Sequence, residues 1–142
     1  MRRALLLIAV LSSCSHSPSR SELFQLRSQC KDLADKLSQN NPPSGYFADD
    51  GKVTVQAHYS PISNRCYVLL FETSELYAMQ DKTLLDGQSG KVLIWESITS
   101  SSRLGHVYSE EWTHLVSGQE SYAHADALIS AKMSEGDSDA DR

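Results

Sequence analysis

Three cysteines, at positions 14, 30 and 66, are the residues whose spacing says most about the chemistry of this chain. A thiol can accept a lipid, form half of a disulfide, bind a metal or act as a nucleophile. Cys30 and Cys66 do not form a CxxC pair and have no histidine nearby at ligand spacing. The spacing therefore favours lipid attachment and disulfide formation over metal or redox chemistry.

The first fourteen residues have the zones of an export signal. Arg2 and Arg3 supply positive charge, residues 4–11 are apolar without a break, and small residues precede Cys14. The apolar run is far shorter than the roughly 20 residues that span a bilayer. The segment Leu11-Ser12-Ser13-Cys14 resembles the lipobox of bacterial lipoproteins, in which the cysteine takes a diacylglyceryl group and becomes the mature N-terminus. The alternative is an ordinary signal peptide with an incidental cysteine.

The lipobox resemblance also implies a location. Ser15, rather than Asp, follows the cysteine, and in Gram-negative lipoproteins this implies sorting to the outer membrane, facing the periplasm. Two or three acyl chains anchor a protein stably, whereas one does so only marginally. We therefore expect a membrane-anchored lipoprotein that contacts the membrane through lipid at Cys14 and needs no transmembrane helix.

The charge balance argues against nucleic acid as a partner. The full chain has 13 basic and 18 acidic residues, and removal of Arg2 and Arg3 with the signal leaves 11 against 18, a formal charge of −7. Nucleic-acid binding calls for clustered lysine and arginine. The same acidity argues against an electrostatic grip on anionic lipid headgroups, so the expected anchor is the lipid itself.

Two cysteines remain once Cys14 carries lipid. In an exported protein a remaining pair indicates one disulfide, here between Cys30 and Cys66. Two free thiols or half of a metal site are the alternatives. A disulfide would close a loop long enough to stabilise the fold by roughly 3–4 kcal/mol in the chain-entropy description.

A helix is predicted to begin at Ser19-Arg20-Ser21-Glu22, because serine followed three residues later by glutamate is the capping-box spacing. Steps of three and four residues then place the apolar side chains on one stripe, namely Leu23, Leu26, Cys30, Leu33, Ala34 and Leu37. Asn41 and the prolines that follow it end the helix.

Three or four antiparallel strands are predicted next. Alternating apolar residues mark residues 53–59, a hairpin loop at 60–65 leads to a strand at 66–73, and residues 84–86 and 91–97 form a second hairpin. Residues 74–81 are ambiguous and could hold a helical turn. The strands at 66–73 and 91–97 are apolar on both faces, which a sheet open to water on one side would not show.

Each face of the predicted sheet therefore needs a cover. The first helix can cover one face through the Cys30–Cys66 bridge. For the other face the sequence offers residues 109–133, where apolar residues recur at helical spacing and Gly118 could divide one helix into two. These residues are Trp112, Leu115, Val116, Tyr122, Ala125, Leu128 and Ile129.

No catalytic or metal-binding constellation emerges from the residue types. The five histidines are scattered, and no pair lies four residues apart on a predicted helix, although zinc needs three or four converging ligands. There is no GxSxG nucleophile motif and no glycine-rich phosphate loop. We therefore predict no catalytic residue, no metal ligand and no cofactor.

One resemblance extends into the mature chain. The segment from His58-Tyr59-Ser60 through Asn64-Arg65-Cys66-Tyr67-Val68, preceded by a helix that contains Cys30, resembles small uncharacterised bacterial proteins. They share a helical cysteine and a hairpin whose second strand begins Asn-Arg-Cys-Tyr. The resemblance covers about a third of the mature chain and supports the Cys30–Cys66 pairing. It implies no activity, and no functional residue is carried over from it.

The expected protein is an α+β domain with an N-terminal helix, an antiparallel meander of three to four strands, and a C-terminal helix or helix pair. Its expected parts are a signal peptide (1–13), a lipidated tether (14–19), one domain (20–133) and a disordered acidic tail (134–142). The leading functional hypothesis is a non-enzymatic binding or assembly factor of the cell envelope with an envelope protein as partner. An envelope enzyme with a dispersed active site, or a small-molecule binder, is the alternative.

Overall fold

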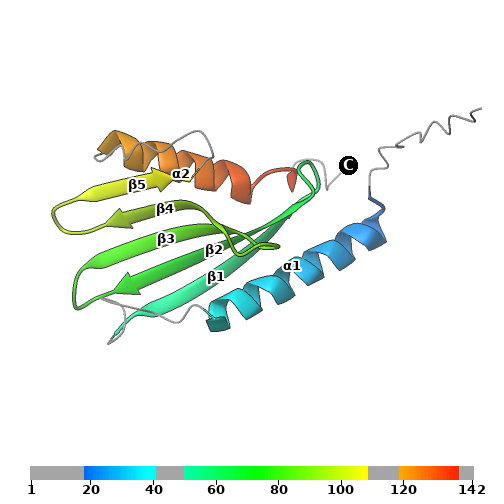
Figure 1. Cartoon of the computed structure of the whole chain (residues 1–142), viewed down its shortest axis with the longest axis horizontal. Helices are drawn as coiled ribbons and strands as arrows, with labels where there is room; N and C mark the ends of the chain where they lie inside the picture. Colours follow the sequence, from blue (N-terminus) through cyan, green and yellow to red (C-terminus); the bar gives the residue numbers. More distant parts are fainter. Residues whose placement is uncertain (1–17, 41–49, 109–118, 138–142) are drawn as a thin grey trace, which may run out of the picture.

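A computed structural model describes residues 18–40, 50–108 and 119–137 of the chain. The signal peptide, the lipobox with Cys14, and Trp112, Leu115 and Val116 lie outside these residues. The described part is an α+β domain, with one helix before a sheet and one after it (Figure 1). Its elements are α1 (Arg20–Asn40), β1 (Lys52–Ser60), β2 (Arg65–Ser74), β3 (Met79–Asp86), β4 (Val92–Ile98), β5 (Arg103–Val107) and α2 (Gln119–Met133).

The capping box predicted for the first helix is present. The backbone amide of Ser19 donates to Glu22 Oε2 at 2.7 Å, and the amide of Glu22 donates to Ser19 Oγ at 3.3 Å. These two bonds satisfy amides that the first helical turn leaves without partners. The predicted apolar stripe of α1 packs on the sheet, with Cys30 and Ala34 fully buried.

The sheet is an antiparallel meander in the order β1-β2-β3-β4-β5. Tyr59 pairs with Cys66 across the first hairpin, and Leu84 pairs with Ile94 across β3 and β4. The meander has five strands rather than the three or four expected from the sequence. The missed strand is β5, whose sequence Arg-Leu-Gly-His-Val contains a glycine, a residue that weakens a strand and obscures the alternating pattern.

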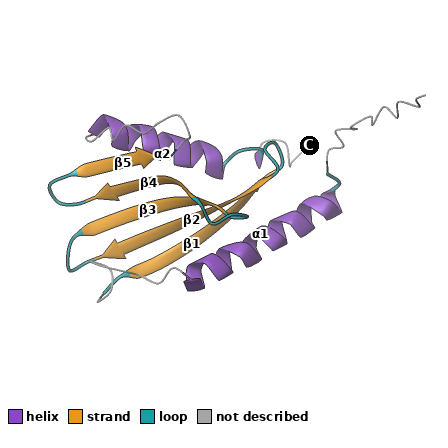
Figure 2. Cartoon of the chain, in the orientation of Figure 1, coloured by secondary structure: helices purple, strands orange, loops and turns teal. Residues whose placement is uncertain are grey.

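The two helices cover opposite faces of the sheet. Cys66, Val68 and Leu70 of β2 pack with α1, whereas Tyr67 and Leu69 of the same strand pack with α2. Side chains alternate between the faces of a strand, so a strand that is apolar on both sides needs a layer on each. The prediction that the C-terminal region supplies the second layer is confirmed, and Figure 2 shows both helices beside the strands.

A disulfide joins Cys30, in the middle of α1, to Cys66 at the start of β2, with 5.4 Å between the two Cα atoms. Both residues are buried in the core beneath α1. The predicted pairing is therefore confirmed, and it links α1 covalently to β2, an interior strand of the sheet that α1 covers.

The chain after α2 differs from the sequence prediction. Residues 134–137, which were assigned to the acidic tail, lie against the β1–β2 hairpin, and Gly136 is buried against Pro61. The side chains of Ser63 and His58 contact Glu135 there. The domain therefore extends to at least Asp137, while residues 138–142 lie outside the described residues.

Candidate functional site

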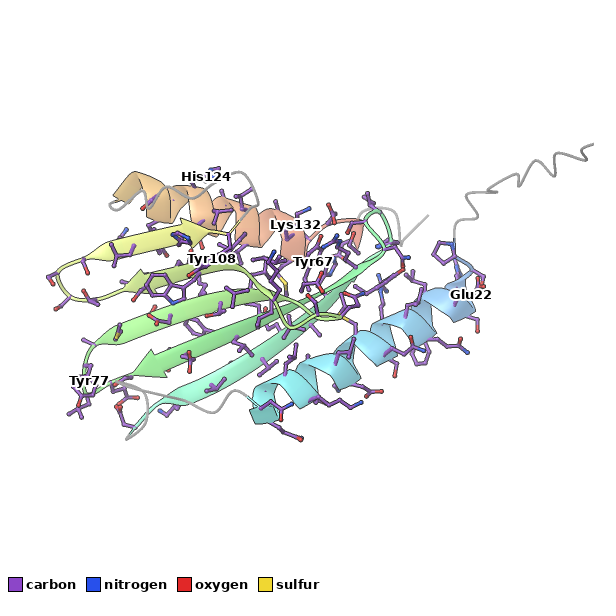
Figure 3. All side chains as sticks on the ribbon, viewed as in Figure 1. Glu22, Tyr67, Tyr77, Tyr108, His124 and Lys132 are labelled. Atoms are coloured by element: carbon purple, nitrogen blue, oxygen red, sulfur yellow. A yellow bond between two sulfur atoms is a disulfide. The ribbon has the colours of Figure 1, made fainter. Side chains whose placement is uncertain are left out.

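The turn between β2 and β3 presents apolar side chains to solvent. We call its four residues, Glu75 to Ala78, the distal turn, because Figure 3 shows Tyr77 at the end of the molecule opposite Glu22 and the start of α1. Leu76 is 67% exposed and Tyr77 is 44% exposed. The sequence leaves residues 74–81 ambiguous, with a helical turn as one possibility, and the structure shows a four-residue turn that leads directly into β3.

Side-chain hydrogen bonds hold the distal turn in place. Ser74 Oγ donates to Asp50 Oδ1 at 2.6 Å, and the backbone amide of Leu76 donates to Asp50 Oδ2 at 2.8 Å. The amide of Tyr77 in turn donates to Ser74 Oγ at 3.2 Å. The Ser74 hydroxyl, followed by the Leu76 amide, lowers the pKa of Asp50 below its ordinary value. Asp50 therefore stays ionised near neutral pH and keeps accepting both bonds.

The backbone of the distal turn is also held in an unfavourable conformation. Ala78 has a φ of 48°, in the left-handed region that costs a residue with a side chain roughly 1–2 kcal/mol. Strained positions of this kind persist where the surroundings determine them, and they cluster at ligand-contacting and switch regions. An exposed apolar turn that is fixed in advance has little conformational entropy to lose when a partner covers it.

A second polar group lies between the sheet and α2. Lys82 Nζ of β3 is 2.6 Å from Glu96 Oε1 of β4 and 2.6 Å from Asp126 Oδ1 of α2. The side chain of Glu96 is 1% exposed, and its carboxylate has no well-directed hydrogen bond among the described residues. The ammonium of Lys82 is therefore what compensates its charge.

The pKa values in this ion cluster follow from burial and charge. Burial is the main cause that raises the pKa of Glu96, and the ammonium of Lys82 opposes it. Burial by itself would lower the pKa of Lys82, but the contacts with Asp126 and Glu96 outweigh it and raise the pKa to about 12. A lysine in this state remains charged and cannot act as a base. The cluster therefore serves to hold α2 against the sheet.

A third polar group fastens the C-terminal end of α2 to the β1–β2 hairpin. Ser63 Oγ donates to Glu135 Oε2 at 2.8 Å, and Lys132 Nζ lies 3.0 Å from Glu135 Oε1. The hydroxyls of Ser60 and Ser63, together with Lys132, lower the pKa of Glu135 to about 2. The Lys132 ammonium also lies 5.5 Å from the centre of the Tyr67 ring, so it joins helix and sheet through a cation–π contact (Figure 3).

This C-terminal group contains serine, histidine and carboxylates, but not in a nucleophilic arrangement. His58 Nε2 donates to the carbonyl oxygen of Glu135 at 2.9 Å, while the Ser63 hydroxyl donates to the Glu135 carboxylate. Activation of a serine requires a base that accepts its proton and is itself oriented by a third group. Here the histidine is bound to a backbone carbonyl, and a carboxylate with a pKa of about 2 is a very weak base.

Two further carboxyl groups have raised pKa values. Glu72 of β2 pairs with Val53 on one side and with Asp81 of β3 on the other. Burial raises the pKa of both carboxyls, and the charge of Asp81 adds to the effect on Glu72. Asp81 is only 8% exposed, and its Oδ1 has no hydrogen-bond partner in the described part of the chain. Such carboxyls are found at active sites, but also in structural networks.

The residues singled out from the sequence fall in different places. Cys30 and Cys66 form the internal disulfide, and Cys14 lies outside the described residues. The sequence does not pair Lys82 with Glu96 or Asp126, although the strand pattern contains a signal for a buried ion cluster. Glu96 lies two residues after Ile94 and so shares its buried face, where an acidic residue needs a partner. No comparable pattern in the sequence indicates that Glu135 contacts the β1–β2 hairpin.

Metal, membrane and ligand binding each require a recognisable feature among the described residues. No three histidine, cysteine, aspartate or glutamate side chains within residues 18–40, 50–108 and 119–137 come together to hold a metal ion. None of the described helices is long and apolar enough to cross a membrane. An open hollow of about 370 Å³ lies along the start of α1, and the residues lining it, Pro18, Glu22, Gln25, Leu26 and Gln29, include none of the carboxyls with a raised pKa.

The described residues therefore include an exposed apolar turn whose backbone is fixed, the distal turn, together with polar groups that fasten α2 to the sheet. Comparison of the whole chain with known proteins identifies no relative whose role could be considered for this one. No protein-family model, no curated protein and no solved structure matches this chain.

Proposed function

We propose that the protein is a lipid-anchored, non-enzymatic binding or assembly factor of the cell envelope that docks a protein partner through the distal turn. The observation that carries the proposal is the combination of exposure and rigidity at Leu76 and Tyr77. Both side chains face solvent, while Asp50 and Ser74 fix the backbone beneath them. A partner with a small apolar pocket would bury both side chains without having to order the turn first.

The anchor in this proposal is lipid on Cys14 at the end of a short tether. The start of α1, which follows the tether, lies at the end of the molecule opposite Tyr77 (Figure 3). A chain fastened to a membrane near the start of α1 would present the distal turn away from the anchor. In this proposal the protein lies on the outer membrane, facing the periplasm, which the signal zones, the lipobox resemblance and Ser15 after the cysteine support.

Site-specific crosslinking tests the docking part of the proposal. We expect benzoylphenylalanine at position 77 to crosslink one partner in intact cells, whereas the same group at the exposed position 91 does not. Leu76→Ser should lower the yield at position 77 at least tenfold, since burying a leucine contributes roughly 1.5–3 kcal/mol. Ile62→Ser is the matched control, because Ile62 is 68% exposed but lies in the β1–β2 hairpin. Equal loss with both substitutions would refute docking through the distal turn.

Metabolic labelling with palmitate tests the anchor separately. We expect the unaltered chain to incorporate label, and Cys14→Ala to abolish the incorporation and leave an unprocessed precursor. Cys30→Ala is the control and should keep the label, because Cys30 is held in the disulfide. Continued labelling of Cys14→Ala would contradict lipid attachment at this residue.

The second candidate is an envelope enzyme that uses Glu72 or Asp81 as a general acid, because these carboxyls are neighbours on β2 and β3 and burial raises the pKa of both. Such a general acid must reach its substrate. Because Asp81 is 8% exposed, this function requires the sheet face around it to open. An Asp81→Asn substitution that abolishes an envelope phenotype without lowering stability would favour the enzyme over the docking factor.

A further inference from the structure

One exposed flank of α1 carries basic residues around an aromatic side chain. Arg20, Phe24, Arg27 and Lys31 follow one another in steps of four, three and four residues, which places them on one stripe of the helix. All four are exposed, and Phe24, at 75%, is the most exposed of the large apolar side chains in the described part of the chain. We call these four residues the basic flank.

The basic flank differs in charge from the rest of the protein. The chain as a whole carries a formal charge of −5, yet the flank has three positive charges and no negative one. The first acidic residue on this side of the helix is Asp35, one turn after Lys31. A count over the whole chain therefore hides a local cluster of positive charge.

The charges of the basic flank are not used within the fold. Among the described residues, Arg20, Arg27 and Lys31 take part in no ion pair, whereas Lys52, Arg65, Lys82 and Lys132 each pair with a carboxylate. Phe24 likewise has no role in the core, which α1 contacts through the neighbouring apolar stripe. Burial of an exposed phenylalanine and neutralisation of three bases would both be favourable.

The position of the basic flank in the chain indicates what covers it. Arg20 lies six positions after Cys14, so the flank begins at most about 20 Å from the lipid attachment point. An amphipathic segment with basic residues beside an aromatic one lies in the interface of an anionic bilayer, where the ring enters the headgroup boundary and the bases contact the anionic groups.

We propose that the basic flank of α1 lies on an anionic lipid surface and thereby holds the domain in one orientation, with the axis of α1 along the bilayer. This inference extends the proposed function, on whose lipid anchor at Cys14 it rests for the orientation. It revises the expectation that lipid alone makes the contact with the membrane. Phe24 inserts among the headgroups, and Arg20, Arg27 and Lys31 bind their phosphates.

Vesicle binding tests the contact without relying on acylation. The mature-length chain, residues 14–142 carrying Cys14→Ser and so without the apolar signal and its two arginines, is mixed with vesicles of phosphatidylglycerol and phosphatidylethanolamine, or of phosphatidylcholine alone. Arg20→Gln/Arg27→Gln/Lys31→Gln should weaken binding to the anionic vesicles roughly a hundredfold, because each base near such a surface contributes about fivefold. The control Lys36→Gln/Lys52→Gln/Lys91→Gln makes the same change in net charge at exposed bases outside the flank and should weaken binding less than tenfold. Higher salt should reduce the difference.

Depth measurement tests the insertion of Phe24. In otherwise identical chains, Phe24→Trp should add tryptophan fluorescence to that of Trp95 and Trp112, and brominated lipids should quench the added signal. The signal added by Leu76→Trp should not be quenched, because position 76 lies in the distal turn, outside the basic flank. Equal loss of binding for the two triple variants, or equal quenching at positions 24 and 76, would overturn the proposal. Since all these chains lack Cys14, a failure here is distinct from a failure of palmitate labelling.

Discussion

At the scale of single residues, the decisive interaction is the one between Lys82 and Glu96. A carboxylate that is 1% exposed on the face of a sheet would be strongly destabilising without a counter-charge. Lys82 supplies that charge and also reaches Asp126, so a single ammonium ties β3, β4 and α2 together. Removal of one partner alone would be strongly destabilising, because it would leave the other as an uncompensated buried charge.

A double-mutant cycle tests this account. We expect Lys82→Met to lower the free energy of unfolding by about 3 kcal/mol at pH 7, because it leaves Glu96 charged and buried. The double variant Lys82→Met/Glu96→Gln should be more stable than Lys82→Met alone, as measured by urea titration. If the change in unfolding free energy of the double variant equals the sum of the changes in the two single variants, the two side chains act independently.

The loss of stability in Lys82→Met should depend on pH. The pKa of Glu96 is raised by burial, so its folded form takes up a proton at a higher pH than its unfolded form does. As the pH falls through this raised pKa, the carboxyl becomes neutral and the deficit of Lys82→Met should shrink. The pKa of Lys82 is about 12 in the fold, so the stabilisation by its charge is complete at neutral pH and is lost only as the pH rises through that value. A deficit that is constant from pH 7 down to pH 4 would contradict the account.

At the scale of elements, the contact between β5 and α2 depends on a glycine. A Cβ atom on Gly105 would lie 2.8 Å from the Cβ of Ala125 and would overlap the carbonyl oxygen of Ser121. The helix backbone therefore passes directly over the strand at this point. Gly105 pairs with Glu96 across the strands, so the close approach also seats α2 over the ion cluster.

Substitution of this glycine should displace α2. We expect Gly105→Ala to lower the free energy of unfolding by about 2–3 kcal/mol, the range for inserting a methyl group into a packed site. Ala125→Gly should not restore stability, because the nearest obstacle is the backbone oxygen of Ser121 rather than the alanine side chain. Full rescue by Ala125→Gly in a thermal denaturation series would show that side-chain crowding, not backbone approach, requires the glycine.

At the scale of the whole molecule, the two ends of the sheet have different surfaces. The distal turn with Leu76 and Tyr77 lies at one end, and the start of α1 lies at the other (Figure 3). The two features can serve a common purpose only if the domain between them is rigid. The Cys30–Cys66 disulfide contributes to this rigidity, because it fixes α1, which carries the basic flank, to the sheet, which carries the turn.

Removal of the disulfide should weaken the whole domain. The bridge closes a loop with a sequence separation of 36 residues, for which the chain-entropy description gives roughly 3–4 kcal/mol. We expect Cys30→Ala/Cys66→Ala to lower the free energy of unfolding by about that amount, and Cys14→Ala to leave it unchanged. Equal stability of the double variant and the unaltered chain would mean that packing alone holds α1 in place.

Local chemistry in the sequence was enough to predict much of this protein. Ser19 and Glu22 specified the start of α1, and the alternating apolar residues of β2 specified a strand covered on both faces, because capping and side-chain alternation depend only on near neighbours in the chain. The cysteine count predicted the disulfide by elimination. The lipid anchor at Cys14 stays a prediction of the same kind.

Tertiary structure decided the rest, since it brings together residues that are far apart in the chain. Lys82 meets Asp126 across 44 positions, and Ser63 meets Glu135 across 72, so no local pattern could have paired them. The rigidity of the distal turn also depends on a distant residue, Asp50, that accepts a hydrogen bond from Leu76. Spacing along the chain determines which face a side chain lies on, but the fold determines what it meets there.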